Sequence, residues 1–215
     1  MSPDLPYYLP GGRWTPVPAT HSFWGVLSWD LVFGLALWAA WCLARQPLYE
    51  LAPRPVQSRW RHPTAGFSGW RLAPVAVLVG AVTHVVWDEF THAGRFGATH
   101  LAILANTYPS PLGPLEGYRY LQYFSSVFGL VVLVWAWRRV PAVATGDAGG
   151  SPLSSLAPAI ALAGGLVAVL VRYTQTGWED WRSAGFAILT SFIGGVVVAV
   201  AALCVARFVS TRRRS

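Results

Sequence analysis

The segment LAPVAVLVGAVTHVVWDEFTH, residues 72–92, decides the fold. Its first part is a nearly unbroken apolar run, and a helix needs roughly 20 such residues to cross a bilayer core. Its second part places His84, Asp88 and His92 four residues apart, so a helix presents all three on one slowly drifting face. Imidazole and carboxylate groups are ligands of divalent metals. The segment therefore predicts a membrane helix that ends in a metal site.

The rest of the chain resembles this segment in its apolar character. Of 215 residues, 54% are hydrophobic and only 12% are charged, and the apolar runs are too long for the core of a soluble domain. We expect an all-α integral membrane bundle of about five helices in one membrane domain, residues 1–215. The external loop 93–119 contains Pro109, Pro111 and Pro114, so it is predicted to turn and to cap the site. The predicted spans are 23–43, 72–88, 120–137, 156–171 and 184–209.

The basic residues predict how the chain crosses the membrane. The formal net charge is +7 and all sixteen basic residues are Arg, but most of them flank apolar runs, which argues against nucleic acid as a partner. Eleven Arg fall on one side of the predicted spans and five on the other, so the richer side is cytoplasmic. The amino terminus is then outside and the carboxyl terminus is inside. This pattern predicts a multi-pass protein of the plasma (inner) membrane.

The same topology brings the candidate ligands to one side of the membrane. They are Asp4, His21, His84, Asp88 and His92. Each has an ordinary structural alternative. A histidine before a helix is commonly a surface or capping residue, an aspartate after Ser-Pro is commonly part of a turn, and a histidine within a span can be hydrogen-bonded inside the bundle.

Asp30 is a second ionisable residue inside a predicted span. It lies about 13 Å below His21 at 1.5 Å per helical residue, where a carboxylate is costly without partners. Nearby polar residues could satisfy this carboxylate in either of two roles, which do not exclude one another. They could support a metal site or hold the spans together by hydrogen bonds. The candidates are His84 and three residues on one face of the third span: Gln122, Ser125 and Ser126.

Several motifs together resemble a known family. The runs GAVTHVVWDEFTHAGRFG and YRYLQYFSSVFGL, with SPDLPYYLPG, THSFWG and SWDLVFG before them, resemble the bacterial membrane family catalogued as domain of unknown function 4184. More loosely, the PD, THS and HxxxDxxTHxG elements are similar to those of inner-membrane-associated metal-dependent hydrolases, and through them to zinc-dependent phospholipase C. The similarity implies metal ligands at Asp4, His21, His84, Asp88 and His92, with Thr91 and Ser22 in support.

The chain departs from this pattern at its amino terminus. The similar hydrolases begin with a further segment that carries a Ser-His or Thr-His pair, whereas Met1 here directly precedes Ser2-Pro3-Asp4. Two explanations are open. Either translation starts further upstream, or the chain lacks one ligand and the helix that carries it.

The ligand types restrict the chemistry. Imidazole and carboxylate without thiolate suit Zn²⁺ best, with Mn²⁺ or Fe²⁺ as alternatives. A metal-activated water could attack a lipid or lipid-linked (phospho)ester at the extracytoplasmic face, with Asp4 or Asp88 as the base. We therefore expect a metal-dependent hydrolase whose partner is membrane lipid. The alternatives are a non-catalytic scaffold braced by metal and a small cation or proton transporter.

Overall fold

The computed structural model describes residues 3–5, 20–60, 69–111, 113–143, 152–177 and 181–212. Within these ranges, five helices are long and apolar enough to cross a membrane. They confirm the predicted all-α membrane bundle, and the chain is a multi-pass membrane protein. Each helix extends past the predicted apolar run at one end or both, because a helix continues where polar residues follow the hydrocarbon-facing part. The spans are Phe23–Leu51, Ala73–His100, Gly117–Arg139, Ser154–Thr176 and Ala184–Ser210.

The first span consists of three consecutive helical segments. Ser22 caps the short helix α3 (Phe23–Gly25), and its Oγ accepts a hydrogen bond from the Gly25 N–H at 3.0 Å. The π-helix η1 (Val26–Asp30) follows, and α4 (Leu31–Leu51) continues from it. Asp30 ends the π-helical segment and is 0% exposed. The wider π turn thus holds a fully buried carboxylate, and such turns are frequent at functional sites.

The helix α6 (Ala73–Thr91) begins the second span, and Pro74 lies in its first turn, where the missing N–H costs no hydrogen bond. It ends at His92, whose backbone is extended at φ −122° and ψ 145°. Gly94 then adopts φ +73°, a conformation that favours glycine, and turns the chain into α7. The carboxyl end of α6 therefore has a fixed geometry.

The predicted external loop contains short elements. They are the helices α7 (Phe96–His100) and α8 (Ala102–Ala105) and the strands β1 (Thr107–Tyr108) and β2 (Leu115–Glu116), which pair antiparallel. The long helix α9 (Gly117–Arg139) follows directly. Gly117 lies against the Ile103 carbonyl oxygen so closely that a Cβ would not fit there. This close approach joins the start of α9 to the loop.

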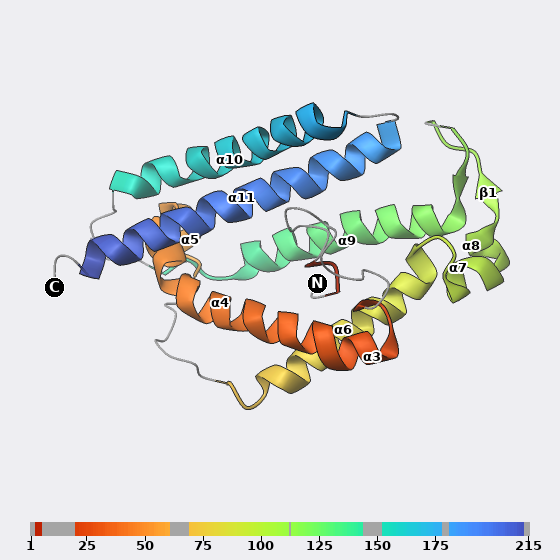
Figure 1. Ribbon diagram of the computed structural model, residues 1–215, viewed down its shortest axis with the longest axis horizontal. Helices are drawn as coiled ribbons and strands as arrows, with labels where there is room; N and C mark the ends of the chain where they lie inside the picture. Colours follow the sequence, from red (N-terminus) through yellow and green to blue (C-terminus); the bar gives the residue numbers. More distant parts are fainter. Residues whose placement is uncertain are drawn as a thin grey trace. The chain divides into compact units, whose positions relative to one another are not determined.

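The chain divides into two compact units, and α6 to α9 pack with α3 and η1 in the first. The second unit contains most of α4, α5 (Arg54–Gln57) and the pair α10 (Pro152–Thr176) and α11 (Trp181–Arg212), which run side by side (Figure 1). Gly164 and Gly195 allow these two backbones to touch, since a Cβ on Gly195 would overlap the Gly164 carbonyl. An ion pair of 2.7 Å between Glu50 and Arg207 joins α4 to α11.

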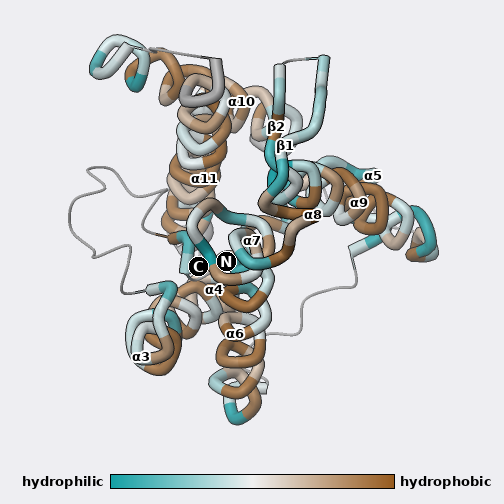
Figure 2. Tube along the Cα trace, turned by 90° about the vertical axis from the view of Figure 1, so that its right-hand side faces the viewer, coloured by the Kyte–Doolittle hydropathy of each residue, from teal (hydrophilic) through white to brown (hydrophobic). Residues whose placement is uncertain are grey.

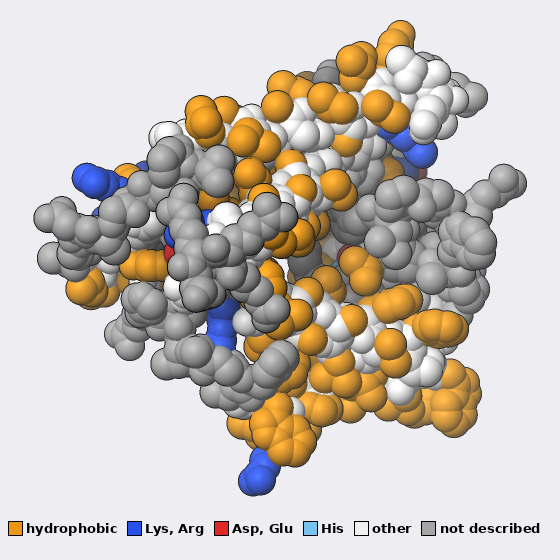
Figure 3. Space-filling view, turned by 60° about the vertical axis from the view of Figure 1, so that its left-hand side comes forward, with side chains coloured by type: hydrophobic (Ala, Val, Ile, Leu, Met, Phe, Trp, Pro, Cys, Tyr) orange, Lys and Arg blue, Asp and Glu red, His pale blue; other side chains and the backbone are white. Residues whose placement is uncertain are grey.

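The long helices are apolar along most of their length (Figure 2). Hydrophobic side chains also predominate among the described atoms of the face drawn in Figure 3, with few Arg side chains between them. None of the apolar window of α9 is buried, and Phe124 is 67% exposed. Exposed apolar side chains of this extent fit contact with lipid, not water.

A substitution of Gly34 tests how closely the first span packs on α6 at Val77. A Cβ on Gly34 would overlap Val77 Cγ1, whereas a Cβ on Gly80 would meet nothing within 4 Å. Because the Val77 side chain is β-branched and stiff, we expect Gly34→Ala to lower the free energy of unfolding in detergent by about 1–3 kcal/mol. The matched control Gly80→Ala should be neutral or raise it by up to about 1 kcal/mol. Equal effects of the two substitutions would contradict this packing.

Candidate metal centre

The last turns of α6 present three polar side chains. His84 Nε2 lies 3.3 Å from Asp88 Oδ2, one helical turn further along. His92 Nδ1 lies 3.2 Å from the other oxygen of the same carboxylate, Asp88 Oδ1. The i, i+4 spacing of the sequence thus produces direct contacts, as helical geometry requires. The Asp88 carboxylate is engaged on both oxygens.

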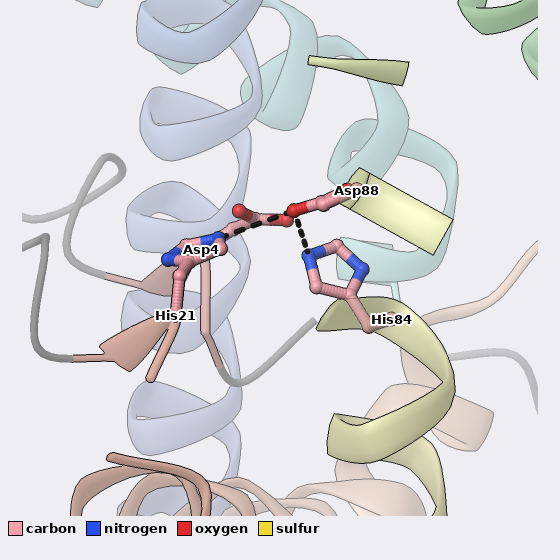
Figure 4. A group of neighbouring side chains, drawn as sticks. All are labelled: Asp4, His21, His84 and Asp88. Atoms are coloured by element: carbon pink, nitrogen blue, oxygen red, sulfur yellow. Dashed lines mark ion pairs between the residues drawn. The ribbon is translucent and has the colours of Figure 1, made fainter. Parts of the chain in front are cut away.

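The segment before the first span supplies a further imidazole. His21 immediately precedes the helix cap Ser22, and its Nε2 lies 3.2 Å from Asp88 Oδ2. Thr20 Oγ1 lies 3.0 Å from His21 Nδ1, so the hydroxyl engages one ring nitrogen while the other faces Asp88. Figure 4 shows the rings of His21 and His84 turned toward the carboxylate from two elements.

The distances fit a metal ion. Two ligands about 2.0–2.1 Å from a tetrahedral Zn²⁺ lie about 3.3–3.4 Å from one another. The two imidazole-to-carboxylate distances of 3.2 and 3.3 Å are close to that value. A group of four residues has potential ligand atoms that all lie within 4.8 Å of one another: Asp4, His21, His84 and Asp88. The donor set of nitrogen and oxygen suits zinc and similar ions.

The site is enclosed on one side and accessible on the other. The side chains of His21 and Asp88 are each 6% exposed, that of His84 is 24% exposed and that of His92 is 48% exposed. Thr20 and Thr91 are almost fully buried. An ion held by the buried groups would therefore keep an approach from the side of His84 and His92.

The other predicted site residues have different positions. Thr91 Oγ donates to the Trp87 carbonyl at 3.1 Å and lies 3.2 Å from His92 Nδ1. Gln122 Nε2 lies 3.4 Å from His92 Nε2, which links α9 to the cluster. Ser125 and Ser126 both donate to the Gln122 carbonyl of their own helix. Ser22 caps α3, and Asp30 lies buried at the end of η1.

Thr20 belongs to the THS element, but its contact with the His21 ring was not predicted from the sequence. A repeated Thr-His pair, at residues 20–21, 83–84, 91–92 and 99–100, is the signal that could have found it. The pattern is only partly informative, because Thr83 donates to the carbonyls of Val79 and Gly80 within its helix. A threonine before a histidine thus supports the ring only where the helix ends or begins.

Glu89, next to Asp88 in sequence, has a structural role. Its Oε2 accepts a hydrogen bond of 2.9 Å from the Phe96 N–H at the start of α7, and its Oε1 pairs with Arg95 at 3.4 Å. These contacts hold α7 against the end of α6. Glu89 thereby fixes the turn that follows the cluster.

Residues 1–210 match the family described as Domain of unknown function (DUF4184). The chain belongs to this family. No curated protein and no solved structure matches it. Membership in DUF4184 confirms the family resemblance of the motifs.

Metal content tests the centre. We expect His21→Ala and His84→Ala each to lower zinc affinity by about 100-fold or more. Substitution of residues outside the ligand set already lowers metal affinity by about 10–100-fold, and loss of a ligand should cost more. The control is His100→Ala, because His100 is exposed and stacks on Phe96 within α7. Zinc is measured on the purified protein by elemental analysis and chelator competition. Unchanged zinc content in both site variants would refute the centre.

Proposed function

We propose that the protein is a membrane-embedded, metal-dependent hydrolase that acts on a lipid or lipid-linked (phospho)ester at the extracytoplasmic face of the plasma membrane. The observation that supports this most is the approach of two imidazole nitrogens, at 3.2 and 3.3 Å, to one oxygen of Asp88. A buried carboxylate between two imidazoles is a donor set that binds Zn²⁺.

The residues of such a site would have different roles. His21, His84 and Asp88 would hold the ion, and the nearby Asp4 carboxylate would take a proton from the attacking water. The ion supplies, when bound, a lowered water pKa and polarisation of the ester. Zinc sites with three protein ligands keep a position open for water, whereas four protein ligands make a closed structural site. The role of Asp4 therefore separates a catalytic centre from a structural one.

The surroundings favour a lipid substrate. A groove of about 520 Å³ lies between α8, β1 and the start of α9, in the same unit as His21, His84 and Asp88. The hydroxyls of Tyr108 and Tyr120 donate to the carbonyls of Ile103 and Pro109 at 3.2 and 2.6 Å, so the rings present apolar faces. An acyl or polyprenyl chain suits these walls. The groove is lined by Ile103, Leu104, Tyr108, Pro109, Gly117, Tyr120, Leu121 and Phe124.

Hydrolysis of a fluorogenic phospholipid in liposomes tests the proposal with purified, zinc-loaded protein. We expect Asp4→Asn to keep zinc but to lower the rate by about 10²–10⁴-fold, the usual contribution of a general base. His84→Ala should lose zinc and activity together. Loss of zinc in Asp4→Asn would instead make Asp4 a fourth ligand of a closed site. Zinc binding without hydrolysis would support the scaffold, and cation flux in proteoliposomes would support the transporter.

The side of the membrane is tested separately. The Arg distribution predicts that the loop containing α7 lies outside and that the connector after α9 lies inside. In a background with Cys42→Ala and Cys204→Ala, we expect an impermeant maleimide to label Thr99→Cys on intact cells. The control Val143→Cys, which is exposed in the connector after α9, should react only after the cells are opened. The reverse pattern would place the cluster on the cytoplasmic side.

A further inference from the structure

The two oxygens of Asp88 have different neighbours. Oδ2 faces the Nε2 atoms of His21 and His84, the geometry that fits an ion. Oδ1 faces His92 Nδ1 at 3.2 Å. His92 is also outside the group whose potential ligand atoms gather within 4.8 Å. Carboxylates that bind a metal are commonly held by hydrogen bonds from residues outside the ligand set, and the contact of His92 with Oδ1 fits that role.

We infer that His92 is a positioning residue that holds the Asp88 carboxylate for metal binding, and that Gln122 of α9 sets the tautomer of His92. This inference rests on the proposed metal centre. It assigns His92 a role different from that of ligand, which the motif resemblance implies. It also makes α9 part of the centre although α9 supplies no metal ligand.

The direction of the hydrogen bonds follows from their donors. The Gln122 amide nitrogen carries only hydrogens for donation, so His92 Nε2, 3.4 Å away, accepts. A neutral imidazole has one donor and one acceptor nitrogen. His92 Nδ1 therefore carries the proton and donates it to Asp88 Oδ1. Thr91 Oγ, whose own hydrogen is directed to the Trp87 carbonyl, accepts beside it.

The backbone strengthens this arrangement. The His92 N–H donates to the Asp88 carbonyl at 3.1 Å, while the His92 ring reaches the Asp88 side chain. Both the main chain and the side chain of Asp88 are thus held by one residue. The extended backbone of His92 at the helix end allows this double contact. Without the ring, the carboxylate could rotate away from His21 and His84.

The test uses zinc affinity by chelator competition and the visible absorption band of the Co²⁺-substituted protein. We expect His92→Ala to weaken zinc binding by about 10–100-fold, with the position of the cobalt band unchanged because the ligands are the same. His92→Gln, which returns an N–H donor, should restore part of the affinity. Gln122→Leu, which has a similar size, should also weaken zinc binding, because loss of the amide donor no longer holds Nε2 as the acceptor and Nδ1 as the donor. Ser126→Ala, on the same helix, is the matched control.

The outcomes separate this inference from the proposed centre. A shifted cobalt band in His92→Ala would make His92 a ligand and overturn the positioning role. Wild-type affinity in both His92→Ala and Gln122→Leu, with binding lost in His84→Ala, would also overturn it while the centre stands. Unchanged binding in His84→Ala would remove the centre itself. Gln122→Leu keeps the test decisive if His92→Ala does not fold.

Discussion

The structure of the first unit depends on how the Asp88 carboxylate is satisfied. The group is nearly buried near the end of a membrane helix, where an isolated charge is expensive. Its partners come from three places: the preceding turn of α6, the residue that ends α6 and the segment before α3. A buried charge can stay ionised only with such partners or a metal. The requirement for them ties the amino-terminal segment to the second span.

The helices around this carboxylate are built to keep the partners in place. The Ser22 cap fixes the start of the first span directly after His21, and the close contact of Gly34 with Val77 sets how near that span lies to α6. Glu89 holds α7 against the end of α6. Each contact is a local feature of helix geometry, yet together they determine the distance between two imidazoles on different elements. Preorganisation of this kind is what a metal centre needs.

The sequence predicted the spans and the core of the cluster because both depend on simple rules. The length of apolar runs indicated the helices, and i, i+4 spacing brought His84 to Asp88. His92 was harder to place, since helical periodicity stops at Thr91 and the extended backbone turns the ring to Oδ1. The π turn before Asp30 has no comparable sequence signal. Ser125 and Ser126 bond to their own helix, which is the nearest acceptor in apolar surroundings.

The depth of the cluster has a consequence for any lipid ester. Moving an acyl chain out of the bilayer costs about 0.8 kcal/mol per CH₂ group, so a water-exposed active site would have to overcome many such increments. Under the proposed function, a site at the carboxyl end of α6 would meet the ester bond at the depth of the lipid headgroups. The side chains of His21 and Asp88 are enclosed, so the exposed edges of His84 and His92 would form the approach to an ion bound at the proposed centre. Because α9 contacts that edge through Gln122, the helix would also border the path of a lipid substrate to the proposed centre.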